Sequence, residues 1–428
     1  MRILLLGMGS RGDVQPLVAL GQRLRRLGYA VSLAAPADLA HVVAGSGVDF
    51  EALSFDLEGP LREGEGREAL RGSAWTQVQE ARLMRQVMAT TAGALASDVS
   101  VLVEEADVVV SGALTFDLVD ALLTDGRGRP TKPHLYAVFA PVWPSAHGDS
   151  VALALQPRAT SPVNLAWSSL AGRVAFDLFR PAGDLVRLRK GLPRRHFRGY
   201  AGAAERTPTL LAASPCVVPP APDWPPALRQ TGYWVRDEVA EGPLDPDLQA
   251  FLADGPPPVH VGFGSMPTPD PRGVVRDVAT VLRRLGARGV VSEGLAGLSV
   301  DLLPASERAH LLGIRHAPHD RLFPRCSVVV HHGGSGTTAA AVRAGVPQVV
   351  VPHAADQPYW GRRMADLGVA AAPIARKDLT ATRLEQALEV ALSPGAREAA
   401  YALRERVRAE DGAGDAARLV DDYLRATT

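Results

Sequence analysis

The sequence contains little cysteine and no long apolar run. Its two cysteines, Cys216 and Cys326, cannot form a disulfide framework, and no Cys/His spacing typical of a metal site surrounds them. Core packing is therefore the role we expect for both. The apolar opening from Ile3 to Leu6 is broken by Gly7, and no run of about 18 apolar residues occurs. We therefore expect a first β-strand in place of a signal peptide, a cytoplasmic location and no stable membrane insertion.

The sequence also lacks an excess of charge of either sign. Its 46 basic and 46 acidic residues cancel, which leaves no electrostatic signature of a partner such as nucleic acid or an anionic membrane. Hydrophobic residues make up 46% and charged residues 21%, as in a soluble globular enzyme. A chain of 428 residues exceeds what one core usually holds, so two α/β domains are expected.

Apolar strands alternate with helical periodicity along the chain. Strands are predicted at 3–6, 30–35 and 107–110 and a helix at 15–27, a pattern typical of a parallel sheet covered on both faces. Prolines concentrate between Ser214 and Asp247 and predict an interdomain linker. The predicted division is an N-terminal domain, a linker, a C-terminal domain and a last helix, at 1–215, 216–246, 247–405 and 406–428.

The most informative stretch is the glycine-rich turn of residues 331–338, between the apolar run Ser327–Val330 and a helical pattern. A turn at a helix start presents unpaired N–H groups, which favour a phosphate. No lysine follows the glycines, so this is no Walker loop. His332 and Thr337 could donate to phosphate oxygens. A turn that merely connects strand to helix is the alternative.

Asp356 and Gln357 follow the next predicted strand. A carboxylate beside a carboxamide suits the hydroxyl groups of a sugar, whereas a solvated loop is the alternative. Together with the glycine-rich turn, the pair suggests a diphosphate with an attached polyhydroxyl group.

Residues 7–12 satisfy G-x-G-x-x-G after a strand and before a helix, as in dinucleotide-binding folds. The second strand, however, ends in Ala34-Ala35-Pro36 without the acidic residue that would bind a ribose. A tight turn with close packing is therefore the favoured interpretation. Asp13, at the start of the following helix, is either a helix-dipole partner or a general base.

Several other residues are weaker candidates. Asp245-Pro246-Asp247 resembles an acidic metal motif but lies in the predicted linker, so we expect no metal. His147 is a candidate acid–base group, and His316 and His319 are either surface histidines or ligand contacts. The segments 55–74 and 140–162 lack periodicity and are expected to be loops.

Taken together, these motifs resemble glycosyltransferase family one, of the GT-B fold, and within it the enzymes that glycosylate antibiotics and sterols. The matching stretches occur in the same order and span most of the chain: 9–16, 231–234, 262–265, 318–324, 331–338 and 356–358.

The resemblance implies an α/β protein of two Rossmann-like domains, with parallel sheets that face each other across a cleft, and a last helix that crosses back to the first domain. It implies Asp13 as the base. The donor's diphosphate would be held by Ser10, Ser265, His332, Gly334, Ser335, Gly336 and Thr337. Its nucleoside would contact His316 and His319, and its sugar Asp356 and Gln357. The acceptor would contact the loops 55–74 and 140–162, and weaker candidate contacts are Phe139, Trp143 and His147.

Two departures from plant relatives leave undecided whether the donor carries UDP or dTDP. His316 stands where those relatives have a tryptophan, and Ala340 stands where they have a glutamate. The expected activity is inverting, metal-independent sugar transfer from a UDP- or dTDP-sugar to a hydroxyl of a lipophilic secondary metabolite. No cofactor is expected, and the protein would be a monomer or homodimer. Alternatives are a sterol or lipid glucosyltransferase, an NAD-dependent oxidoreductase, and a non-catalytic partner that activates another glycosyltransferase.

Overall fold

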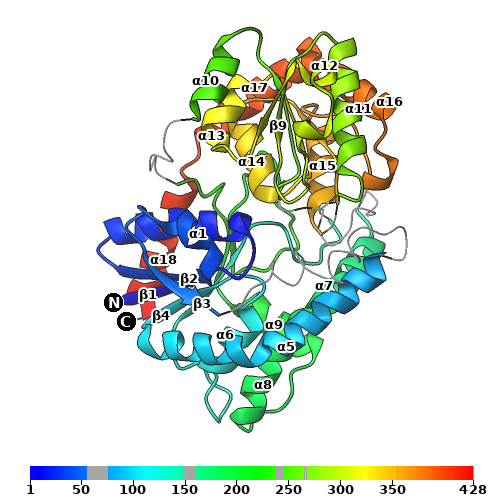
Figure 1. Ribbon diagram of the computed structural model, residues 1–428. Coiled ribbons are helices and arrows are strands. Elements are labelled where there is room, and N and C mark those ends of the chain that lie inside the picture. The colour runs from blue at the N-terminus through cyan, green and yellow to red at the C-terminus, as the bar shows by residue number, and fades with distance from the viewer. Residues whose placement is uncertain are drawn as a thin grey trace. The chain divides into compact units, whose positions relative to one another are not determined.

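The computed structural model describes residues 1–54, 76–147, 150, 160–236, 244–264, 266, 268–353 and 355–427. These residues form two compact units: unit 1 holds those up to 236 and from 410 onward, and unit 2 holds 244–409. Each unit is built on one parallel sheet with helices around it (Figure 1). The predicted class, α/β with two parallel sheets, is confirmed.

The sheet of unit 1 has the order β3-β2-β1-β4-β5-β6-β7. Its strands are β1 (Arg2–Leu6), β2 (Ala30–Pro36), β3 (Asp49–Leu53), β4 (Val108–Ser111), β5 (His134–Val138), β6 (Thr209–Leu211) and β7 (Leu228–Gln230). Its helices are α1 (Arg11–Arg26), α2 (Ala40–Val43), α5 (Thr76–Glu105), α6 (Phe116–Leu123), α7 (Pro162–Phe179), α8 (Pro181–Arg189), α9 (Phe197–Arg206) and α18 (Gly412–Thr427).

The two faces of this sheet carry separate cores. Ile3 and Leu5 of β1 face one way and pack in a cluster with α1 and α18, whereas Leu4 and Leu6 face the other way and pack with α5, α6 and α8. Both faces are therefore covered, which explains why β1 is apolar throughout. The segment 85–105 of α5 is long and apolar enough to cross a membrane by length and composition. Its buried side chains, however, belong to this second core cluster.

The end of the chain returns to unit 1. Helix α18 lies against α1 (Figure 1), and the hydroxyl of Tyr29 donates to the carboxylate of Asp421 at 2.6 Å. Glu410, two residues before α18 in the sequence, accepts a hydrogen bond from the Ser214 hydroxyl at 2.7 Å. The last element of the chain thus completes the first core.

The segment predicted as a linker, 216–246, differs from the expectation. It contains β7, and the side-chain amide of Gln230 in that strand donates to the carbonyls of Ala213 and Val218. Trp234 is also buried in the unit 1 core. Unit 1 therefore continues past residue 230, because the prolines bracket a short edge strand that they do not interrupt.

The sheet of unit 2 has the order β10-β9-β8-β11-β12. Its strands are β8 (Val259–Gly262), β9 (Gly289–Ser292), β10 (Leu311–Ile314), β11 (Val328–His331) and β12 (Gln348–Val350). Its helices are α10 (Pro246–Ala253), α11 (Pro271–Arg284), α12 (Ala305–Arg308), α13 (His319–Leu322), α14 (Ser335–Ala344), α15 (Gln357–Asp366), α16 (Ala381–Ala391) and α17 (Pro394–Arg408).

Each sheet reverses its strand order at one point. In unit 1 this switch lies between β1 and β4, and in unit 2 between β8 and β11. Ligands of open α/β sheets bind beyond the carboxyl ends of the strands at such a point. The loops after β1 and β11, which sequence reasoning singled out, both start at a switch.

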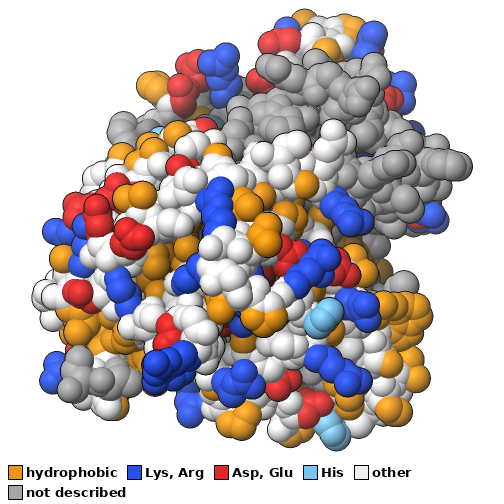
Figure 2. All heavy atoms as spheres, turned by 90° about the horizontal axis from the view of Figure 1, so that it is seen from below, with side chains coloured by type: hydrophobic (Ala, Val, Ile, Leu, Met, Phe, Trp, Pro, Cys, Tyr) orange, Lys and Arg blue, Asp and Glu red, His pale blue; other side chains and the backbone are white. Residues whose placement is uncertain are grey.

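Charges on the surface are mixed. On the face shown in Figure 2, basic and acidic side chains are interspersed among hydrophobic ones. This distribution matches the balanced composition and offers no extended patch of one sign on the described part of that face.

Unit 2 encloses four neutral histidines. Burial lowers the pKa of His260, His332 and His353 to about 4 and that of His331 to about 3. Burial disfavours the charged imidazolium because the ring loses its hydration. In unit 1, burial lowers the pKa of His134 to about 4 in the same way.

We predict that acidification unfolds unit 2 before unit 1. Below the ordinary histidine pKa of 6.5 the unfolded chain takes up protons that the folded unit excludes, so stability falls as the pH drops from about 6.5 to about 4. Hydrogen exchange followed by mass spectrometry at pH 7.5, 6 and 5, corrected for intrinsic rates, would show peptides of β8, β11 and β12 losing protection first. Simultaneous loss in β1 and β4 would contradict the expectation.

Candidate functional site

His331 ends β11 and is fully buried. One ring nitrogen, Nε2, lies 2.8 Å from the side-chain oxygen of Gln348 and therefore carries the proton, because that oxygen only accepts. The other, Nδ1, accepts the N–H of Gly333 at 3.1 Å. Both nitrogens are thus used to fix the turn. The structure assigns His331 a supporting role in the loop.

His332 occupies space that two glycines leave open. A Cβ on Gly334 would lie 2.5 Å from its Nε2, and one on Gly264, in the loop after β8, would lie 3.2 Å from its Cε1. The ring therefore sits between the loops that follow the two strands at the switch point. Its Nδ1 is buried without a hydrogen-bond partner among the described residues.

Helix α14 begins beside this ring without a side-chain cap. Its N-cap residue is Gly334, which has no side chain to accept a hydrogen bond, and the amide of Thr338 donates to the Gly334 carbonyl at 2.9 Å. The amides of Ser335, Gly336 and Thr337 precede the first bond of the helix and are oriented toward its start. Uncapped amides and the helix dipole together favour an anion at this place.

Asp356 and Gln357 start the neighbouring helix α15. The carboxylate of Asp356 accepts the indole N–H of Trp360 at 2.7 Å, and the side-chain oxygen of Gln357 accepts the backbone N–H of His353 at 2.7 Å. Burial raises the pKa of Asp356. Both side chains are therefore held in one orientation before any ligand arrives.

The turn before Asp356 is strained. Ala355 has φ of 54°, the one positive φ outside glycine among the described residues. A left-handed conformation costs an ordinary residue about 1–2 kcal/mol, and such strain is concentrated at functional sites. Sequence reasoning missed both this turn and His353, which precedes it by two residues; a histidine so close to the acidic residue was the available signal.

The two candidate nucleoside contacts lie after β10. His316 is exposed, and His319, in α13, stacks on Phe323 with ring centroids 4.3 Å apart. His260 of β8 lies behind them, 5.2 Å from the Phe323 ring, and its Nε2 is 2.9 Å from the Ser292 hydroxyl. His319 is thus packed on an aromatic ring, Phe323, that in turn contacts His260 of β8.

In unit 1, Asp13 and Ser10 form a capping box at the start of α1. The Asp13 carboxylate accepts the N–H of Ser10 at 2.9 Å, and the Ser10 hydroxyl accepts the N–H of Gly12 at 3.3 Å. A Cβ on Gly9 would collide with the Asp13 carboxylate. The second glycine of G-x-G-x-x-G therefore makes room for a negative side chain, where a dinucleotide fold would admit a pyrophosphate.

The candidate acceptor residues follow β5. Trp143 is 6% exposed and packs edge-on against Tyr136, and half-buried Phe139 packs edge-on against Trp234 of the core. His147 is exposed, and its backbone N–H donates to Ser145. Ser265 and the segment 55–74 lie outside the described residues, as does most of 148–159.

The acidic motif 245–247 is a helix start. The Asp245 side chain accepts the N–H of Asp247 at 2.9 Å and caps α10, with Pro246 in the first turn. The described residues contain no cluster of three His, Cys, Asp or Glu that could hold a metal ion. This motif therefore has a structural explanation.

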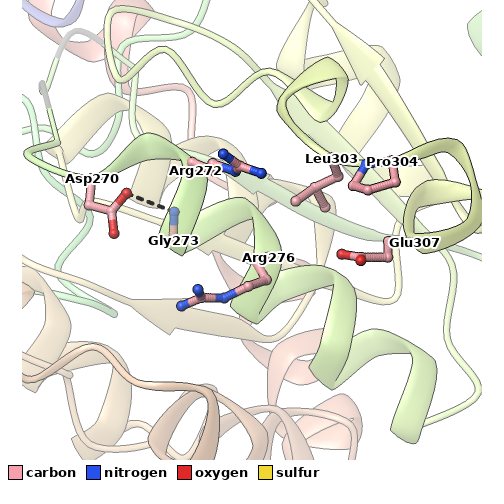
Figure 3. Close-up of a pocket in the computed structure, with 7 residues that line it drawn as sticks. All are labelled: Asp270, Arg272, Gly273, Arg276, Leu303, Pro304 and Glu307. Carbon is pink, nitrogen blue, oxygen red and sulfur yellow. Dashed lines mark hydrogen bonds between the residues drawn. The ribbon is translucent and has the colours of Figure 1, made fainter.

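A separate cavity of about 380 Å³ lies on the flank of α11 (Figure 3). Exposed Arg272 and Arg276 and the Glu307 carboxylate line it, and Asp270 caps the helix beside it. None of the sequence-predicted site residues lines this cavity, so it adds nothing to the site at the switch point.

Two family models match the chain, one in each half. The chain matches the model of the Glycosyltransferase family 28 N-terminal domain over residues 3–109. It also matches that of the C-terminal domain of erythromycin biosynthesis protein CIII-like proteins over residues 303–419. The two matches fall in unit 1 and mainly in unit 2, respectively.

Relatives match over the full length of the chain. It is 34% identical to O-mycaminosyltylonolide 6-deoxyallosyltransferase of Streptomyces fradiae, covering 100% of this chain and 99% of that protein. Vancomycin aglycone glucosyltransferase of Amycolatopsis orientalis is 33% identical, with 99% and 98% covered. A sterol 3-beta-glucosyltransferase of Arabidopsis thaliana is 29% identical, with 99% of this chain and 68% of the plant protein covered.

Solved structures share the fold. The glycosyltransferase of kitacinnamycin has a TM-score of 0.72 at 20% identity, with 98% of both chains covered. The calicheamicin glycosyltransferase CalG4 has a TM-score of 0.68 at 18% identity, with 99% of this chain and 98% of that one covered. The two parallel sheets are thus those of the GT-B fold, and the chain is an enzyme that belongs to the GT-B glycosyltransferases, in the group that contains antibiotic glycosyltransferases and sterol glucosyltransferases.

Proposed function

We propose that this glycosyltransferase moves a sugar from a UDP- or dTDP-sugar to a hydroxyl of a lipophilic secondary metabolite, with inversion and without a metal ion. The observation that carries the proposal is the uncapped start of α14, with His332 seated between two glycines and with Asp356 and Gln357 on the next helix. This arrangement suits a diphosphate bonded to a polyhydroxyl group.

The donor would be held by unit 2. Its diphosphate would accept hydrogen bonds from the amides of Ser335, Gly336 and Thr337 and from the neutral ring of His332, which would also stabilise the charge that develops as the sugar leaves. The solved structures of VinC and of the spinosyn rhamnosyltransferase SpnG, with TM-scores of 0.60 and 0.62, contain thymidine diphosphate, which supports this class of donor.

Asp13 would be the general base. It lies at the switch point of the unit 1 sheet, and the Ser10 N–H fixes the orientation of its carboxylate. As the acceptor oxygen attacks the anomeric carbon, its proton would pass to Asp13, and the diphosphate would leave from the opposite face. One base and a departing diphosphate suffice for transfer with inversion.

The exposed apolar side chains of helix α7 favour a lipophilic acceptor over a polar one. Val163, Trp167, Leu170 and Val174 follow the helical repeat and form one stripe, and these side chains are 49–59% exposed. An exposed apolar stripe of this kind marks a surface for a ligand, a membrane or another protein. We propose that this stripe helps to bind the acceptor, because a lipophilic molecule that packs against it would remove apolar surface from water on both sides.

The alternatives fit the site less well. A dinucleotide cofactor at residues 7–12 would place its pyrophosphate against the Asp13 carboxylate, and two negative groups repel each other. A non-catalytic partner has no need of the groups His332, Asp356 and Gln357, which are all in place.

Asp13→Asn is expected to lower kcat by about 10²–10⁴-fold, since it removes the base. The asparagine oxygen can still accept the Ser10 N–H, so thermal unfolding and nucleotide binding should remain close to those of the wild type. Asp13→Ala is the matched control: it loses both the base and the carboxylate that accepts the Ser10 N–H in the capping box, and it should also destabilise the protein by about 1 kcal/mol. Full turnover by Asp13→Asn would remove this residue from the role.

Gly334→Ala is expected to weaken binding of UDP and dTDP at least about tenfold, because the new Cβ would displace the His332 ring. Gly395→Ala, in α17 of the same unit, is the control, since its Cβ would meet nothing within 4 Å. Calorimetry with both nucleotides measures the difference. Equal affinity in the two variants would show that the ring does not contact the diphosphate.

Trp167→Ala is expected to raise the KM for a lipophilic acceptor about tenfold and to leave the affinity for nucleotide unchanged, since α7 belongs to unit 1. Mass spectrometry of products from a panel of macrolide, polyketide and sterol acceptors identifies the substrate first. The same assay then gives the KM. Tyr401→Ala, an exposed aromatic of α17 in unit 2, is the control and should change neither quantity.

A further inference from the structure

His353 lies in the loop between β12 and α15, two residues before the strained Ala355. Its Nδ1 is 2.8 Å from the carbonyl oxygen of Val351, which can only accept, so Nδ1 carries the proton. The remaining nitrogen, Nε2, is therefore an acceptor. It is buried and has no hydrogen-bond partner among the described residues.

The surroundings of His353 place it beside the donor site. Its ring packs on Phe263, in the loop after β8, with centroids 5.0 Å apart, and its backbone N–H donates to Gln357. It is also close enough to His332 for the two rings to interact electrostatically. The residue thus bridges the diphosphate loop and the pair on α15.

An unpaired acceptor at this place calls for an explanation. A buried polar atom without a partner costs about 1–3 kcal/mol, and most such atoms in folded proteins are paired. His331, at the end of β11, has both of its nitrogens bonded within the protein, whereas His332, the proposed diphosphate contact, keeps one nitrogen unpaired in the described part of the chain, as His353 does. The neighbours of His353 are the groups proposed to hold the donor, so the missing partner is best sought in the donor.

We propose that Nε2 of His353 accepts a hydrogen bond from one hydroxyl of the donor's sugar and so helps to select which sugar is bound. This inference rests on the proposed function, and it adds a neutral acceptor to the carboxylate of Asp356 and the carboxamide of Gln357. A donor that lacks the matching hydroxyl leaves Nε2 unpaired and binds less tightly.

Two substitutions separate this contact from support of the loop. His353→Asn keeps an amide N–H near the position of Nδ1 for the Val351 carbonyl but has nothing at Nε2, whereas His353→Gln places a polar atom near Nε2. The probes are UDP, dTDP, UDP-glucose, dTDP-glucose and the monodeoxy forms of the two sugar nucleotides. Calorimetry gives each Kd, and thermal unfolding monitors folding.

The proposal expects His353→Asn to weaken the preferred sugar nucleotide about tenfold, with the bare nucleotide unchanged within about twofold, and His353→Gln to recover part of the loss. One monodeoxy donor should bind the wild type as weakly as the complete donor binds His353→Asn. The affinity of that monodeoxy donor should not fall further in His353→Asn, because the hydroxyl that Nε2 would contact is already missing. Equal weakening of nucleotide and sugar nucleotide, or no weakening, overturns the inference and leaves the proposed function standing. A wild-type protein that binds neither nucleotide overturns the proposed function and this inference with it.

Discussion

The site of unit 2 depends on the space that glycines leave around one histidine ring. Because Gly264 and Gly334 lack a Cβ, the loops after β8 and β11 can close on His332 from two sides. Those strands are neighbours only because the sheet reverses its order between them. A side chain at either glycine would displace the ring from the uncapped start of α14. The proposed anion site therefore depends both on the order of the strands and on the positions of the two glycines.

Unit 1 uses the same construction for the opposite purpose. Gly9 makes room for the Asp13 carboxylate, as Gly334 makes room for the His332 imidazole. Asp13 follows β1 and His332 follows β11, and each of these strands lies at the switch point of its own sheet. In one unit the loop favours an anionic ligand, and in the other it presents an anionic side chain. The capping bond from Ser10 explains how Asp13 can stabilise α1 and still hold one orientation as the proposed base.

Much of this could be predicted from sequence because the strands are buried on both faces. The apolar runs at 3–6 and 328–330 fall within β1 and β11, and the glycines mark the turns that follow. The edge strand β7 was missed, since three residues among prolines carry no periodic signal. His353 was missed for another reason: an unpaired nitrogen depends on a tautomer, and the tautomer depends on a carbonyl that only the folded loop brings within reach.

The neutral state of the histidines connects the chemistry of unit 2 with its packing. Protonated rings at His331, His332 and His353 would place adjacent positive charges against the positive end of α14, in an interior that cannot hydrate them. Burial avoids this repulsion and leaves each ring with one proton and one acceptor. A neutral imidazole donates from one nitrogen and accepts at the other, so in the proposed site His332 can donate to the diphosphate and His353 can accept from a sugar hydroxyl, whereas lysine or arginine at either position could only donate.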